Sequence, residues 1–175
     1  MFNAKQIIKL LLLLLITSTL IYLSCKIVTK LNHKKEVAQR IKQLPNFSYN
    51  TIRGTVVTQN TLNQNYNTVF INFNTECDFC KHEAAQISEH FVTFKKTQFV
   101  FVSNQDANII KEFANTYNLL QHDTVIFALD TKNNFSTTFD THSFPYAALY
   151  NTNKQLIKVF KGATTAKTLL KALEQ

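Results

Sequence analysis

The stretch from Thr68 to Phe94 restricts the fold more than any other part of this chain of 175 residues. It begins with TVFINFN, an uninterrupted run of β-forming residues that is typical of a strand buried on both faces. Apolar residues then follow at alternating spacings of four and three, which indicates one face of a helix: Cys80, Ala84, Ile87, Phe91 and Phe94. A buried strand that leads directly into a helix predicts an α/β fold.

Later segments extend this pattern to a mixed sheet. QFVFVS and TVIFALD are typical of further strands, with a helix between them over QDANIIKEFANTYNL. We expect the buried face of that helix to be formed by Ile109, Ile110, Phe113 and Tyr117. PYAALYN and QLIKVFKG predict a β-hairpin, and a last helix begins after a cap at Thr164 or Thr165. The order of these elements predicts parallel crossovers first and antiparallel pairing last.

An apolar segment, Ile7 to Leu23, precedes this domain. Its charge-free part, Leu10 to Leu23, would form a helix about 21 Å long at about 1.5 Å per residue. Ile7, Ile8 and a snorkelling Lys9 would be needed to span a hydrocarbon core of about 30 Å. Three interpretations remain open: a retained membrane anchor, a lipoprotein signal that ends at Cys25, or a cleaved signal peptide.

The net charge of +8 is concentrated in the first part of the chain. Residues 1–44 contribute +7 and the remainder only +1. The globular part is therefore nearly neutral, which argues against a nucleic-acid partner, and a basic cluster beside anionic membrane lipid explains the excess better. Counting Lys and Arg alone would place the domain in the cytoplasm, because the richer flank follows the apolar segment.

Cys77 and Cys80 lie where the first central strand leads into its helix. Cys77 is predicted at the helix start, where unpaired N–H groups favour a thiolate, and Cys80 one turn later, facing the core. This asymmetry suits dithiol exchange, in which one thiol attacks a disulfide and the other resolves the mixed disulfide.

Other roles for the cysteine pair fit the sequence less well. A structural disulfide would close a very small loop and contribute little stability. No second C-x-x-C or spaced His pair completes a zinc set with His82 and His90, so we expect no metal. A haem attachment site would need His at residue 81, which is Lys. A peroxiredoxin would carry Pro and Thr where this chain has Phe70 and Asn74.

From about Phe47 onwards the chain resembles thioredoxin-fold proteins, in particular the membrane-anchored TlpA-type thiol–disulfide oxidoreductases and their redoxin relatives. The resemblance lies in FINFNTEC, in Glu83 shortly after the cysteines, in FDTHSFPYAALY and in LIKVFKG. It implies a thioredoxin-like mixed sheet flanked by helices, with Pro145 in a cis peptide bond facing the cysteines. In the family, the residue before this Pro, here Phe144, presents its backbone to an extended substrate.

The resemblance also implies a function and a layout. Residues 1–25 would form the anchor or signal segment, 26–45 a basic linker or short helix, and 46–175 the thioredoxin-like domain. The domain would act in cell redox homeostasis as a reductase of protein disulfides, held at the bacterial inner membrane and facing the periplasm or exterior. It would need an electron-donating thiol protein, membrane-bound or soluble, and no cofactor beyond the Cys77–Cys80 disulfide.

Two features qualify this expectation. Glu76 and Asp78 place negative charge beside Cys77, which disfavours its thiolate and predicts a reducing pair. The strand position that carries a buried acid in thioredoxins is Ile71 here, and Glu76 is a candidate proton shuttle in its place. The alternative to an enzyme is a non-enzymatic thioredoxin-fold binding module at the membrane, with a structural or vestigial cysteine pair.

Overall fold

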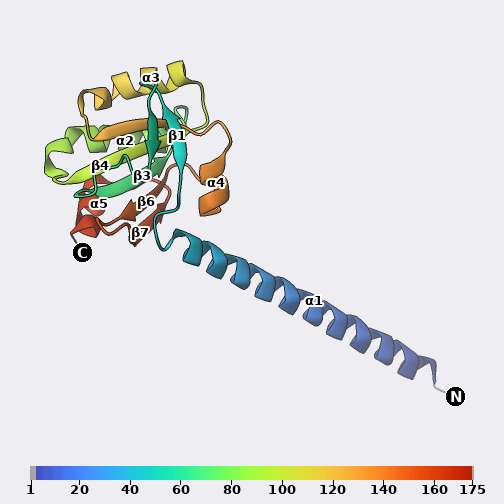
Figure 1. Ribbon diagram of the computed structural model, residues 1–175. Helices are drawn as coiled ribbons and strands as arrows, with labels where there is room; N and C mark the ends of the chain where they lie inside the picture. Colours follow the sequence, from blue (N-terminus) through green and yellow to red (C-terminus); the bar gives the residue numbers. More distant parts are fainter. Residues whose placement is uncertain (1–2, 175) are drawn as a thin grey trace. The chain divides into compact units, whose positions relative to one another are not determined.

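The computed structural model describes residues 3–174, and the chain divides into two units, Met1–Gln39 and Arg40–Gln175. Nearly all of the first unit belongs to one helix, α1 (Ala4–Ile41), whose last residues enter the second unit. The helix continues without interruption through residues 25 and 26 and includes most of the segment that we expected to be a basic linker or short helix. Figure 1 shows α1 as a single long helix.

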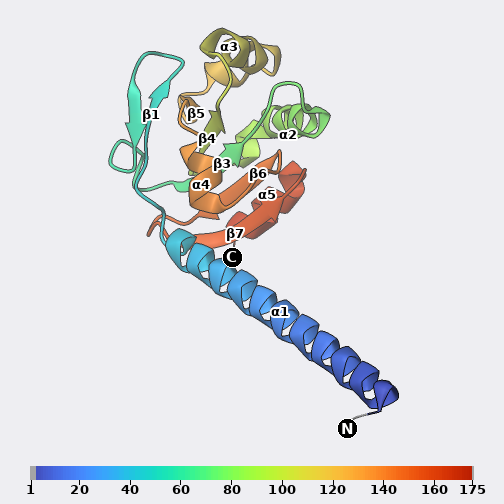
Figure 2. The same ribbon diagram turned by 90° about the vertical axis from the view of Figure 1, so that its right-hand side faces the viewer.

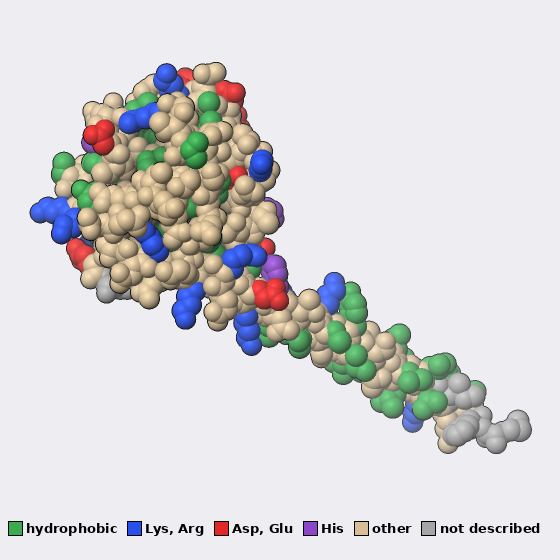
Figure 3. All heavy atoms as spheres, in the orientation of Figure 1, with side chains coloured by type: hydrophobic (Ala, Val, Ile, Leu, Met, Phe, Trp, Pro, Cys, Tyr) green, Lys and Arg blue, Asp and Glu red, His purple; other side chains and the backbone are tan. Residues whose placement is uncertain are grey.

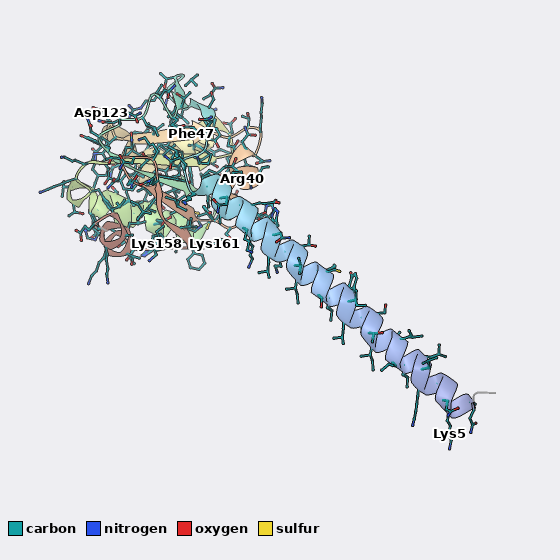
Figure 4. The ribbon with its side chains drawn as sticks, turned by 60° about the horizontal axis from the view of Figure 1, so that its bottom comes forward. Lys5, Arg40, Phe47, Asp123, Lys158 and Lys161 are labelled. Carbon is teal, nitrogen blue, oxygen red and sulfur yellow. The ribbon has the colours of Figure 1, made fainter. Side chains whose placement is uncertain are left out.

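The large apolar side chains of α1 between Ile8 and Leu31 are exposed, as Figure 3 shows for the face it presents. The run of leucines leaves no polar face along this stretch, which is the pattern of a helix in an apolar medium. Lys5 and Arg40 lie near the two ends of the helix (Figure 4). By length and composition α1 is able to cross a membrane, although an N-terminal signal sequence meets the same test.

Among residues 3–174, seven strands form one mixed sheet in the order β2-β1-β5-β4-β3-β6-β7. The strands are β1 (Ser48–Thr51), β2 (Val56–Thr58), β3 (Asn67–Asn72), β4 (Thr97–Ser103), β5 (Val125–Leu129), β6 (Tyr146–Tyr150) and β7 (Leu156–Lys161). The central strands β3, β4 and β5 are parallel, whereas β6 and β7 on one side and β1 and β2 on the other pair antiparallel. This arrangement confirms the predicted mixed sheet.

Three helices bury their apolar sides against one face of the sheet: α2 (Asp78–Glu89), α3 (Ala107–Thr116) and α5 (Ala166–Leu173) (Figure 2). Both crossovers, β3-α2-β4 and β4-α3-β5, move across the sheet in the same direction, so their right-handedness puts α2 and α3 on the same side. Phe73 lies at the centre of this core, with its ring 4.9 Å from Phe113 and 5.6 Å from Phe101.

The opposite face of the sheet has an aromatic core. The helix α4 (Asn134–Phe139) packs Phe135 and Phe139 against Tyr146 of β6. Phe70 of β3 meets Tyr150 edge to face on the same side. Because successive side chains of a strand alternate between faces, β3 and β6 serve both cores, which explains their continuous apolar character.

The helix predicted to continue to Phe94 ends earlier. After α2 stops at Glu89, the backbone of His90 leaves the helical region and the chain forms a short 3-10 helix, η1 (Phe91–Thr93). Phe94 still reaches the core, with its ring 5.0 Å from that of Phe99. The spacing of the aromatic residues therefore identified core side chains correctly but not the helix end.

The buried face of α3 is narrower than the sequence predicted. The buried residues of the helix are Ile110, Phe113 and Ala114, whereas the side chain of Ile109 is 47% exposed. A second 3-10 helix, η2 (Leu119–Gln121), follows α3 and supplies buried Leu119. The remaining prediction, a cap for the last helix, is confirmed at Thr165, whose hydroxyl accepts a hydrogen bond from the Thr168 N–H.

Candidate active site

The loop between β3 and α2 is fixed by hydrogen bonds from the neighbouring strand's exit loop. The Thr75 N–H donates to Gln105 Oε1 at 2.8 Å, and Gln105 Nε2 donates back to Thr75 Oγ1 at 3.0 Å. Gln105 follows β4, the parallel neighbour of β3. Gln105 was not predicted from the sequence. A polar residue just after a parallel strand could have indicated it, because functional loops of α/β sheets lie at the carboxyl ends of the strands.

Asn74 shapes the turn that leads to the first cysteine. Its side-chain Oδ1 accepts the Glu76 N–H at 2.8 Å, and its backbone carbonyl accepts the Cys77 N–H at 3.2 Å. This local turn ends the extended backbone of β3 and lets α2 begin at Asp78, with Cys77 as the residue that precedes the helix.

Cys77 is partly exposed and its thiol is free. As the N-cap of α2 it has an extended backbone (φ −77°, ψ 115°), and its side chain does not cap the helix. The Sγ atom therefore remains available, with the unpaired N–H groups of the first helical turn beside it. The thiol donates to the backbone carbonyl of Phe144 at 3.7 Å.

The Phe144–Pro145 peptide bond is cis. It comes to Cys77 because β6 starts at Tyr146, which pairs with Asn72 at the end of β3. The Pro145 carbonyl accepts the Gly162 N–H at 2.8 Å from the end of β7, so the segment is held from its far side. The side chain of Phe144 remains 36% exposed.

Cys80 is buried on the inner side of α2. Burial raises the pKa of its thiol well above the ordinary range, and the Asn74 backbone N–H offsets part of this effect. The neighbouring Cys77 and Glu83 raise the pKa further, because they disfavour a second negative charge. The two thiols thus differ in exposure as the sequence predicts for an attacking and a resolving pair.

Glu83 is the buried acid of this site. Its side chain is 1% exposed on the inner face of α2, and neither carboxyl oxygen has a hydrogen-bond partner of good geometry among residues 3–174. Burial raises its pKa from the ordinary value of about 4.5 to about 8, and the Thr164 backbone N–H lowers it by less. The acid is therefore mostly protonated at neutral pH.

Glu76, the candidate proton shuttle from the sequence, is exposed at the surface. Asp78 is also exposed and pairs with Lys81, whose Nζ lies 2.9 Å from Oδ1. The ion pair raises the pKa of Lys81 and compensates part of the negative charge expected beside Cys77. In the described part of the chain, no group of three or more His, Cys, Asp or Glu could hold a metal ion.

A family model described as the AhpC/TSA family matches residues 41–171. The chain belongs to the AhpC/TSA family. A search of curated protein sequences finds no match. Membership of the AhpC/TSA family supports an oxidoreductase role in general, and the match covers the whole sheet together with Cys77 and Cys80.

Solved structures similar to this AhpC/TSA chain have the same thioredoxin-like fold. A secreted disulfide oxidoreductase from Mycobacterium tuberculosis, homologous to E. coli DsbE, matches with a TM-score of 0.63 at 17% identity, over 77% of this chain and 96% of that one. StoA from Bacillus subtilis matches with a TM-score of 0.58 at 21% identity, over 73% and 95%. The peroxidoxin BcpB from M. tuberculosis matches with a TM-score of 0.65 at 14% identity, over 75% and 94%.

Proposed function

We propose that this chain is a thiol–disulfide oxidoreductase that reduces protein disulfides, with Cys77 as the nucleophile and Cys80 as the resolving thiol. The observation that carries the proposal is the unequal placement of the two thiols. Cys77 is partly exposed at the start of α2, whereas Cys80 is buried one turn later beside a carboxyl group. In such a pair the exposed thiol can form a mixed disulfide with a substrate, and the buried thiol can then resolve it.

The reaction begins when the Cys77 thiolate attacks one sulfur of a substrate disulfide. A bond from Cys77 to that sulfur forms, and the other substrate sulfur leaves as a thiolate. Cys80 then loses its proton and attacks Cys77 Sγ, which releases the second substrate thiolate. The substrate gains two electrons and two protons, and the Cys77–Cys80 disulfide forms.

Glu83 is the group that moves a proton at Cys80. In its ionised form it accepts the Cys80 proton when that thiol attacks. When an external thiol protein reduces the Cys77–Cys80 disulfide again, Cys80 is the buried leaving group, and protonated Glu83 returns the proton. A pKa near 8 suits both directions, since neither form of the carboxyl group is rare near neutral pH.

Phe144 and Pro145 would hold the substrate. The backbone at Phe144 forms an edge beside Cys77, where the Phe144 carbonyl already accepts a hydrogen bond from the thiol. A substrate strand could pair with this edge while its disulfide meets Cys77. We further propose that α1 anchors the chain in the bacterial inner membrane, with the domain facing the periplasm or exterior.

Peroxide reduction is the second candidate, because the AhpC/TSA family and the match to BcpB point towards it. The positions where peroxiredoxins carry Pro and Thr hold Phe70, buried in β3, and Asn74, whose side chain accepts the Glu76 N–H. Asn74 has no hydroxyl to activate a peroxide at Cys77. Disulfide exchange is therefore the better-supported chemistry.

The two candidates separate in one assay with the purified full-length chain in detergent. With dithiothreitol as the electron donor, we expect it to accelerate the reduction of insulin disulfides and to leave hydrogen peroxide unconsumed above the uncatalysed rate. Cys77→Ser should abolish the acceleration, and Cys25→Ser, which removes the exposed thiol of α1, should leave it unchanged. Peroxide consumption without insulin reduction would favour the peroxidase, and neither activity would favour the binding module.

A further inference from the structure

A groove of about 230 Å³ lies beside the attacking cysteine, between the start of α2 and the outer side of α3. Thr75 and Lys81 line it on the α2 side, and they are the residues two before and four after Cys77. The Lys81 N–H donates to the Cys77 carbonyl at 3.0 Å, which fixes that wall relative to the nucleophile.

The opposite wall, on α3, combines apolar side chains with Glu112 and Thr116. It includes Ile109, Phe113 and Tyr117. The Phe113 ring packs 4.9 Å from Phe73 and 4.8 Å from Tyr117, so the wall is anchored to the core of the domain. Ile109 is 47% exposed although it lies on an otherwise amphipathic helix, and no packing of this domain accounts for it.

The charges around the groove restrict the kind of substrate that could bind there. Glu76 and Asp78 flank Cys77, Glu112 lies on the groove wall, and Lys81 is the single cation among these neighbours. This local excess of negative charge repels anionic thiols such as glutathione, each of which carries two carboxylates and one ammonium group. It favours a neutral or basic polypeptide.

We propose that the α2–α3 groove binds an apolar side chain close to the reacting cysteine of a neutral or basic polypeptide substrate, with Ile109 as a specificity-determining residue. The proposal rests on the disulfide exchange proposed above and names the kind of substrate for it. The cysteine of such a substrate would meet Cys77 between the groove on one side and the exposed Phe144 on the other.

The test uses synthetic peptides whose single cysteine is joined to thionitrobenzoate by a disulfide. The Cys77 thiolate attacks the peptide sulfur, the sulfur–sulfur bond to the aryl group breaks, and thionitrobenzoate leaves with the electron pair and is read by its absorbance. The Cys77 proton passes to solvent. Peptides with leucines or with serines around the cysteine are compared with the corresponding glutathione derivative, using the reduced full-length chain in detergent.

We expect the leucine peptide to react about tenfold faster than the serine peptide, the size expected from burying part of one leucine side chain. Ile109→Ser should slow the leucine peptide several-fold and leave the serine peptide unchanged. The matched control is Val92→Ser, because Val92 is 84% exposed near the opposite end of α2. This control should not change either rate.

Charge is tested with leucine peptides that carry two added lysines or two added glutamates. The lysine peptide should react faster than the glutamate peptide and the glutathione derivative, and added salt or Glu112→Gln should narrow the gap. Equal rates for the leucine and serine peptides would overturn the proposal, and this comparison needs no variant. Release of thionitrobenzoate from no probe at all would instead contradict the proposed disulfide exchange itself.

Discussion

Glu76 and Glu83 have the same side chain, but α2 separates them. Glu76 precedes the helix and stays in water, whereas Glu83 lies on its inner side with Cys80 and Ala84. The sequence placed Glu83 in the family pattern, but its burial could not be predicted from local spacing. That burial depends on contacts that are distant in sequence. Helix α5 packs against α2, and the N–H of Thr164, just before α5, lowers the pKa of the Glu83 carboxyl group.

A raised carboxyl pKa makes the stability of the domain depend on pH. Above the unfolded pKa of about 4.5 the unfolded state releases the Glu83 proton, but the folded state keeps it up to about 8. Folding therefore loses stability as pH rises through this window, by about 1.4 kcal/mol for each unit of pKa difference.

Glu83→Gln removes this titration while keeping the shape of the side chain. We expect the variant to match the wild type at about pH 5 and to be more stable by several kcal/mol at about pH 9. Chemical unfolding of the full-length protein, followed by tyrosine fluorescence at both pH values, measures the difference. Glu76→Gln, at the exposed position, is the matched control for the loss of one carboxyl group. A constant gap between Glu83→Gln and the wild type at the two pH values would contradict the raised pKa.

At the scale of elements, the periodicity of apolar residues predicted which helices and strands exist, and their order, better than it predicted where each one begins and ends. The run TVFINFN is β3, shifted by one or two residues, and the C-x-x-C pair does mark the passage from β3 to α2. The end of α2 could not be predicted, because the 3-10 helix after His90 keeps the apolar spacing that a longer helix would have. The exposure of Ile109 could not be predicted either, because the sequence pattern assigns an apolar residue next to Ile110 to the buried face of the helix.

The charges at the start of α2 lead to a prediction for the reduction potential of the proposed cysteine pair. Glu76 and Asp78 oppose a thiolate at Cys77, although Lys81 compensates part of this charge. We expect a reduction potential nearer to the roughly −270 mV of thioredoxin than to the oxidising end near roughly −120 mV. Glu76→Gln should raise the potential by favouring the reduced pair.

Equilibration with glutathione buffers measures this potential. The matched control is Glu89→Gln, which removes the same charge at the far end of α2 and should not shift the value. A wild-type potential above the roughly −180 mV of protein disulfide isomerase would contradict a reductase and favour an oxidase or isomerase.

At the scale of the whole molecule, α1 and the redox domain give opposite indications of topology. The cluster Lys26, Lys30, Lys34 and Lys35 follows the apolar stretch and favours a cytoplasmic domain by the positive-inside rule. The proposed function favours the outer side, where disulfides of substrate proteins form and persist.

Whole-cell labelling with a membrane-impermeant thiol reagent distinguishes these topologies. The Cys25→Ser background removes the thiol of α1, and Cys77 is the partly exposed thiol that remains to react. We expect labelling of intact cells under reducing conditions, and none when Cys77→Ser is added. Labelling that appears only after lysis would place the domain in the cytoplasm.

Trapping of mixed disulfides tests which cysteine attacks the substrate and which resolves the mixed disulfide. Cys80→Ser keeps the attacking thiol but removes the group that releases the product, so adducts with substrate proteins should accumulate on non-reducing gels and disappear with dithiothreitol. Cys77→Ser should trap far less, because its remaining thiol in the domain is buried on the inner side of α2. Equal trapping by both variants, or trapping by neither, would contradict the account.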